Sequence, residues 1–218
     1  MPCPYPQPTG LRWAARPARR RHRVSDTTWR NLRLITTLET LGVTYAIGGS
    51  VAAMMYSQPR FTIDVDLMVS APLKQLNQLV QEVQSWQVYI TPFESIVETN
   101  MPGGMPFNII DGTIGTKADL YIAKNSGLDA SAMARRRRLV WDRATDTAAW
   151  FLSPEDVILY KLSYYRQGGE VAQKHPTDIA NMLDVIGSEL DLAYLSHWAA
   201  EIGVADLWQA LWDEFQKS

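Results

Sequence analysis

The fold is decided by residues 45–67, which read YAIGGSVAAMMYSQPRFTIDVDL. The apolar run that ends at Ile47 predicts a short strand, and the glycines that follow predict a turn into a helix of small residues over positions 50–56. Residues 63–69 then predict a half-buried strand with Ile63, Val65 and Leu67 on one face and Asp64 and Asp66 on the other. We therefore expect a strand, a glycine turn, a short helix and a second strand that carries Asp64 and Asp66.

Two aspartates two positions apart on a strand leave the same face a few ångströms from each other. Charges of like sign at that distance resist joint ionisation unless a cation or donor groups lie between them. Carboxylate oxygens are the ligands that Mg²⁺ prefers, so Asp64 and Asp66 indicate a magnesium site. A D-x-D pair alone would equally fit an exposed edge strand with an acidic outer face.

The segment Gly48-Gly49-Ser50 favours the metal interpretation. Glycines at a strand-to-helix turn let the backbone approach a phosphate closely, exposed backbone N–H groups favour an anion, and the serine hydroxyl can donate. An anion cradle separated from a metal-binding pair by one short helix fits a magnesium–triphosphate site.

A third carboxylate would complete such a site, and Asp119 is the candidate because it interrupts the apolar strand of residues 118–122. Asp111 is the competitor, but it precedes Gly112, where aspartate is an ordinary turn residue. We favour Asp119.

Further periodic segments complete the predicted architecture. Helices are expected from Ser25 or Asp26 to Gly42, over 73–83, and, in the helical C-terminal part, over 154–167, 177–186, 192–202 and 205–215; strands are expected over 44–47, 107–110, 118–122 and 150–152. The strands at 107–110 and 118–122 predict a hairpin around Gly112 and Gly115. The chain thus divides into a tail (1–24), an α/β domain (25–152) and a helical lobe (153–218).

The charge distribution sets the tail apart. Residues 1–24 hold six arginines and no acid, and taking those six from the 21 basic side chains leaves fifteen against 23 acidic ones in residues 25–218. Prolines interrupt the tail, so a disordered extension is favoured over an electrostatic arm for nucleic acid. Cys3 is the single cysteine, so it forms no internal disulfide. No apolar run is long enough to span a membrane, and none follows the tail as in a secretory signal. We therefore expect a cytoplasmic protein.

Residues 45–52 and 60–67, with Asp119 downstream, resemble the signature of the polymerase-β-like nucleotidyltransferase superfamily. The resemblance covers about residues 43–123. The form R-x-T-x-D-x-D at 60–66 and the S-P-E-D helix start at 153–156 are similar to the small bacterial branch of minimal and AbiEii-like (abortive-infection toxin) proteins. Those toxins use a lysine on a helix after the sheet and an aspartate further on, which correspond here to Lys161 and Asp178.

The resemblance implies a mixed sheet flanked by helices, with a C-terminal helical lobe. It also implies transfer of NMP from an NTP to an acceptor hydroxyl or phosphate. Asp64, Asp66 and Asp119 would hold Mg²⁺ (two ions), with Asp119 helping to deprotonate the nucleophile, and Gly48, Gly49, Ser50 and Lys161 would contact phosphates. Arg60 and Thr62 would support the acidic strand or, in the minority interpretation, contact the triphosphate.

The resemblance leaves the acceptor open. RNA or tRNA, as in toxin-type members with a cognate antitoxin partner, stands beside a small molecule. A catalytically silent protein that binds nucleotide or a partner is the alternative from another class. The presence of all three acids argues against it.

Several residues carry two interpretations at this point. Lys161 fits a phosphate ligand or a surface lysine equally, and the run Arg135–Arg138 fits an RNA contact less well than a partly solvated run paired with the acidic body. Tyr164 and Tyr165 could stack on a base, but a core position is favoured, as it is for the tryptophans of the last two helices.

Overall fold

The computed structural model describes residues 26–99, 102, 104–142 and 146–217. The predicted disorder of residues 1–24 lies outside the described residues. None of the helices in the described part of the chain combines the length and the hydrophobicity needed to cross a bilayer.

Seven strands of the described chain form one mixed sheet in the order β3-β4-β5-β2-β1-β7-β6. Their bounds are β1 Thr44–Ile47, β2 Asp64–Ser70, β3 Tyr89–Ile90, β4 Phe107–Asp111, β5 Thr116–Ile122, β6 Arg137–Asp142 and β7 Thr147–Phe151. Strand β2 is antiparallel to β1 and parallel to β5, while β4 and β5 form the predicted antiparallel hairpin. The predicted mixed α/β sheet with flanking helices is therefore confirmed.

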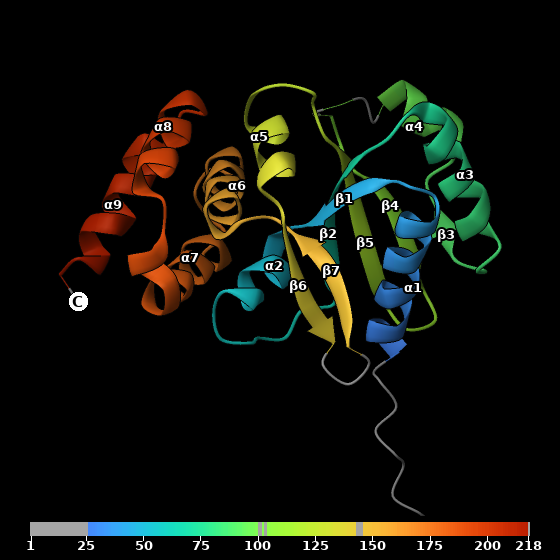
Figure 1. The fold of residues 1–218 in the computed structure, drawn as a ribbon, viewed down its shortest axis with the longest axis horizontal. Helices are drawn as coiled ribbons and strands as arrows, with labels where there is room; N and C mark the ends of the chain where they lie inside the picture. The colour runs from blue at the N-terminus through green and yellow to red at the C-terminus, as the bar shows by residue number, and fades with distance from the viewer. Residues whose placement is uncertain (1–25, 100–101, 103, 143–145, 218) are drawn as a thin grey trace, which may run out of the picture.

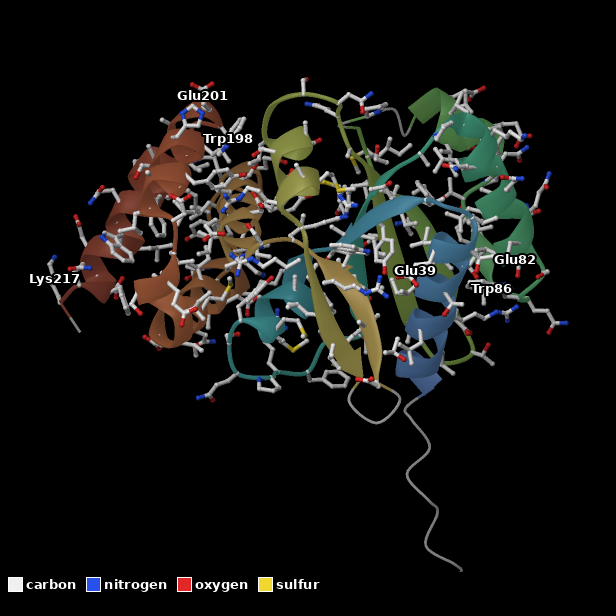
Figure 2. All side chains as sticks on the ribbon, viewed as in Figure 1. Glu39, Glu82, Trp86, Trp198, Glu201 and Lys217 are labelled. Atoms are coloured by element: carbon white, nitrogen blue, oxygen red, sulfur yellow. The ribbon has the colours of Figure 1, made fainter. Side chains whose placement is uncertain are left out.

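The helices cover both sides of this sheet (Figure 1). Helices α1, α3 and α4 lie on one side; α2 and the C-terminal helices α6 to α9 lie on the other, with α5 near one end of the sheet. Their bounds are α1 Asp26–Thr40, α2 Gly49–Met55, α3 Leu73–Gln84, α4 Phe93–Thr99, α5 Gly127–Arg135, α6 Pro154–Gln167, α7 Lys174–Ile186, α8 Leu192–Glu201 and α9 Ala205–Phe215, with a 3₁₀ turn at Gly187–Glu189. Figure 2 marks the two ends of the molecule, with Trp86 and Glu82 at the α3 end and Trp198 and Glu201 at the α8 end.

The alternation of β2 determines which side chains reach the core. Val65 and Leu67 are buried, while Asp64 is exposed and Asp66 is partly buried on the opposite face. A continuous apolar cluster joins the sheet to the C-terminal helices, since Ile47 and Phe151 belong to the same cluster as Ile158 and Leu195. The helical lobe is therefore packed onto the same sheet that carries the aspartates.

Several elements were not predicted. Strand β6 includes part of the arginine run, and β3, α4 and α5 lie in segments without a clear apolar period. Helix α7 begins at Lys174, three residues before the predicted start, because Pro176 lies in its first turn, where its missing N–H is tolerated. Helix α6 begins after Ser153 as predicted, and the Ser153 hydroxyl accepts a hydrogen bond from the Asp156 backbone N–H.

Candidate functional site

Strand register brings the three predicted carboxylates to one face of the sheet. In the parallel pair β2–β5, Asp66 lies opposite Asp119 and Asp64 lies opposite Lys117. Residues opposite each other on neighbouring strands are about 5 Å apart between backbones, so Asp66 and Asp119 are immediate neighbours. The same register places Met68 beside Tyr121, one step further along the same face.

The glycine turn packs directly against Asp66. Gly49 has a φ of 59°, and a Cβ atom at this position would overlap the Asp66 carboxylate. The Gly48 N–H also donates to the Asp66 carbonyl over 2.8 Å. Only glycine satisfies both the backbone angle and the close approach at position 49, which explains the second glycine of the pair.

Burial, followed by the neighbouring charge of Asp119, raises the pKa of Asp66. Asp119 itself accepts hydrogen bonds from Lys117, at 2.8 Å, and from the Asn108 side-chain amide. Within the part of the chain that the structure describes, no group of three or more His, Cys, Asp or Glu side chains stands ready to hold a metal ion. The carboxylate donors suit Mg²⁺, but the predicted set of three is not preassembled, and Asp119 is held by Lys117.

A second charged cluster links the two lobes across the turn. Lys161 Nζ donates to Asp178 Oδ2 over 2.6 Å, and Arg60 binds both Asp178 oxygens through Nε and Nη2 at 2.8 and 2.9 Å. Arg60 Nη2 also donates to the Ser50 hydroxyl. We call Ser50, Arg60, Lys161 and Asp178 the cationic cluster.

The Lys161 and Asp178 side chains are only 4% and 5% exposed, so the interpretation of Lys161 as a surface lysine is wrong. Burial would raise the pKa of Asp178, but the hydrogen bonds from Arg60 and Lys161 together hold it below its ordinary value. For Lys161, burial lowers the pKa and the bond to Asp178 opposes that effect. Asp178 therefore stays ionised between two cations.

Arg60 and Thr62 differ in what they support. Arg60 forms its salt bridge with Asp178 on α7 and not with the acidic strand, since its loop reaches across to the helical lobe. The Thr62 hydroxyl donates to the Asp64 carbonyl over 3.4 Å, which is a weak support of that strand.

One cleft of about 380 Å³ unites these groups. It is lined by Gly48, Gly49, Ser50, Arg60, Thr62, Asp64, Asp66, Asp119 and Lys161, which are all the predicted site residues except Asp178; Asp178 lies behind the wall, bound to Arg60 and Lys161. Sequence reasoning missed Lys174 and His175, which lie in the first turn of α7 and before the helix start predicted at residue 177, and it placed Tyr164 in the core. Tyr164 is 38% exposed and lines the cleft, and its position one turn after Lys161 was the available signal.

Residues outside the cleft take the structural roles that were favoured for them. Asp111 ends β4 and accepts hydrogen bonds from the backbone and hydroxyl of Thr113, as a turn residue does. Arg135 donates to the buried Glu155 over 3.1 Å, and the guanidinium groups of Arg136 and Arg138 lie over the Trp150 ring. Trp208 is buried, and Trp198 and Trp212 pack against the core.

No family model matches the sequence, and no curated protein matches it. Among solved structures, the antibiotic-resistance factor ANT(2'')-Ia superposes with a TM-score of 0.55 at 17% identity, covering 80% of this chain and 94% of that one. A second structure of ANT(2'')-Ia, in complex with adenylyl-2''-tobramycin, gives the same TM-score at 14% identity, with 81% and 96% covered.

The lincosamide antibiotic adenylyltransferase LnuA, bound to lincomycin, superposes with a TM-score of 0.50 at 15% identity over 74% of this chain and 97% of that one. At these identities the likeness concerns the fold. The chain has a nucleotidyltransferase fold.

Proposed function

We propose that this protein is a Mg²⁺-dependent nucleotidyltransferase that moves NMP from an NTP to a hydroxyl of a small-molecule acceptor. The observation that carries the proposal is that a single cleft is lined by Asp66 beside Asp119 and also by Arg60, Lys161 and Ser50. Paired acids next to a cluster of cations and donors suit a substrate that combines a divalent cation with polyphosphate.

Asp64 and Asp66 would hold Mg²⁺, and Asp119 would join them as a ligand in competition with its present bond to Lys117. When bound, the metal would neutralise charge on the triphosphate and lower the pKa of the attacking hydroxyl. The Gly49 turn fixes the position of Asp66, so this ligand is preorganised by the backbone.

The cationic cluster would receive the phosphates that leave. The acceptor oxygen forms a bond to the α-phosphorus while the bond to the β-phosphate oxygen breaks, and negative charge grows on the pyrophosphate. Arg60, Lys161 and the Ser50 hydroxyl line the cleft and could stabilise that charge, and Gly49, which is partly exposed there, has no side chain to prevent close approach. Asp119 would accept the proton of the attacking hydroxyl.

A small-molecule acceptor is favoured over RNA. The arginine run, for which an RNA contact was the less favoured interpretation, is engaged within the protein, since Arg135 binds Glu155 and two further arginines lie over Trp150. The similar structures include an aminoglycoside-linked complex and a lincosamide adenylyltransferase. Transfer to tRNA by a toxin with an antitoxin partner would be an alternative outcome of the test.

The test is transfer of label from each of the four α-labelled NTPs, with Mg²⁺ or EDTA, to a panel of hydroxyl-rich small molecules and to total RNA. Asp64→Asn and Asp66→Asn are the active-site variants, and Asp184→Asn, an exposed carboxylate elsewhere on α7, is the matched control. We expect Mg²⁺-dependent transfer to a small molecule, lowered at least about a hundredfold in either site variant and unchanged in the control.

Label entering RNA alone would keep the reaction class and replace the acceptor. Absence of transfer with retained NTP binding would favour the catalytically silent alternative, a nucleotide-binding protein of this fold.

A further inference from the structure

An aromatic wall continues the cleft beyond the cationic cluster, and the proposed reaction assigns it no role. Tyr121 on β5, Tyr164 on α6 and His175 on α7 follow one another with ring centroids 6.0 and 6.5 Å apart, and all three line the cleft. They come from three different elements, so the wall is a product of tertiary packing.

The wall stands one helical turn from the proposed phosphate ligands. Tyr164 follows Lys161 by three positions on α6, and His175 precedes Asp178 by three positions on α7. Three positions correspond to about 4.5 Å along a helix axis. Because α6 and α7 pack against each other, both aromatic side chains lie beside the cationic cluster. A group joined to a bound triphosphate through a sugar would reach this wall.

The chemistry of the wall fits a neutral, flat, polar ring. Burial raises the pKa of Tyr164 above its ordinary value, so its hydroxyl stays protonated. Burial, together with the charges of Lys161, Lys174 and Arg60, lowers the pKa of His175 against the opposing effect of Asp178. Its buried Nδ1 has no hydrogen-bond partner among the described residues, whereas a structural histidine normally has one.

We propose that Tyr164, Tyr121 and His175 form the nucleobase subsite of the enzyme, in which Tyr164 supplies the stacking face and His175 reads the edge of the base. This inference rests on the proposed function. The neighbouring rings are tilted by 44° and 35° to Tyr164, so a base stacks on Tyr164 alone; the edge of a purine is long enough to contact a second ring as well, whereas a pyrimidine contacts one, and the subsite therefore favours purine nucleoside triphosphates. The acceptor would then occupy the opposite, open end of the cleft, where Asp64 is exposed.

The test compares a ligand that has a base with one that lacks it. Titration calorimetry of the full chain, with Mg²⁺, measures the affinity for ATP, GTP, CTP, UTP and inorganic tripolyphosphate. The variants are Tyr164→Ala, Tyr164→Phe and His175→Ala; Tyr165→Ala, the next residue on α6 and outside the cleft lining, is the matched control. Thermal unfolding of each variant verifies the fold.

We expect Tyr164→Ala to weaken purine nucleotide binding at least about tenfold while tripolyphosphate binding changes less than about twofold. Tyr164→Phe and Tyr165→Ala should retain the wild-type affinities. His175→Ala should reduce the ratio of purine to pyrimidine affinity, again without effect on tripolyphosphate.

Unchanged ATP affinity in a folded Tyr164→Ala variant, or an equal loss for ATP and tripolyphosphate, would overturn the nucleobase subsite and leave the proposed transferase standing. If the wild-type chain bound no NTP at all, the proposed function would fail together with the subsite.

Discussion

At the scale of single residues, Gly49 is where the backbone and the chemistry of the site meet. A Cβ at this position would overlap the Asp66 carboxylate, and the positive φ disfavours any other residue. Gly49→Ala should therefore displace Asp66, abolish measurable transfer and lower the free energy of unfolding by about 1 to 3 kcal/mol. Activity assays and urea unfolding measure the two effects.

Gly115→Ala is the matched control. Gly115 has a φ of 67° in the β4–β5 turn, but a Cβ there would meet nothing within 4 Å. The control should show a loss of stability from backbone strain without the loss of activity. Equal activity in the two variants would contradict the role given to Gly49.

The two partners of the buried ion pair, Lys161 and Asp178, contribute unequally to stability. Removal of Asp178 leaves Lys161 buried and uncompensated, whereas removal of Lys161 leaves Asp178 bound to Arg60. Asp178→Asn should therefore destabilise the protein by about 3 to 5 kcal/mol, and Lys161→Met by clearly less. Urea unfolding at pH 7 ranks the two variants, and an inverted order would refute this account.

The same ion pair predicts that the free energy of unfolding depends on pH. Because the pKa of Asp178 is lower in the folded protein than in the unfolded chain, its contribution is fully present above about pH 4, the ordinary carboxyl value. The contribution is lost as the pH falls through the lowered folded-state pKa. The stability difference between wild type and Asp178→Asn should thus be constant from pH 7 to 5 and shrink in more acidic solution.

At the scale of elements, the start of α6 joins the lobes through buried polar contacts. Ser153 donates to Asp156 Oδ2 over 2.6 Å, and Tyr194 on α8 donates to Asp156 Oδ1 over 2.6 Å. Glu155 accepts from Arg135 and from the Asp191 backbone N–H, so the two acids tie α5 and α8 to α6. The S-P-E-D segment is therefore more than a helix start signal.

Ser153→Ala should remove the cap and one donor to a buried carboxylate, and it should lower the free energy of unfolding by about 1 to 2 kcal/mol. Thermal unfolding measures the effect. Ser85→Ala is the comparison, because the exposed Ser85 hydroxyl donates to the Glu82 carbonyl and to no other group of the described residues. A loss of equal size in both variants would show that the buried contact adds nothing.

The elements also show what the sequence can predict. The alternation of residues 63–69 was sufficient to place Asp64 and Asp66 on one face, and the caps of α6 fixed both of its ends. Val157 and Ile158, four and three positions before Lys161, already indicate that the lysine lies on an apolar face, although a surface position fitted equally well at that stage.

The remaining features depend on tertiary structure. The contact between Lys117 and Asp119, two positions apart on β5, follows from the local alternation, but the position of Asp119 opposite Asp66 depends on the register between β2 and β5 and is not encoded in the local pattern. The same holds for Arg60, whose partner lies 118 positions away, and for His175, which reaches the cleft only when α7 packs on α6.

At the scale of the whole molecule, the sheet and the helical lobe share one apolar core, and the cationic cluster crosses their boundary. We expect them to unfold together.

Leu195 on α8 is fully buried, so Leu195→Ala should lower the free energy of unfolding by about 2 to 5 kcal/mol. In a cooperative molecule the slowest amide protons of β2 lose as much protection as those of α8, since both exchange through the same global unfolding. Native-state hydrogen exchange measures this, with Leu192→Ala, exposed on the same helix, as the control. Loss of protection confined to α6–α9 would mean that residues 25–152 and 153–218 are separate folding units, and a substrate cleft built from both would then open whenever the lobe unfolds.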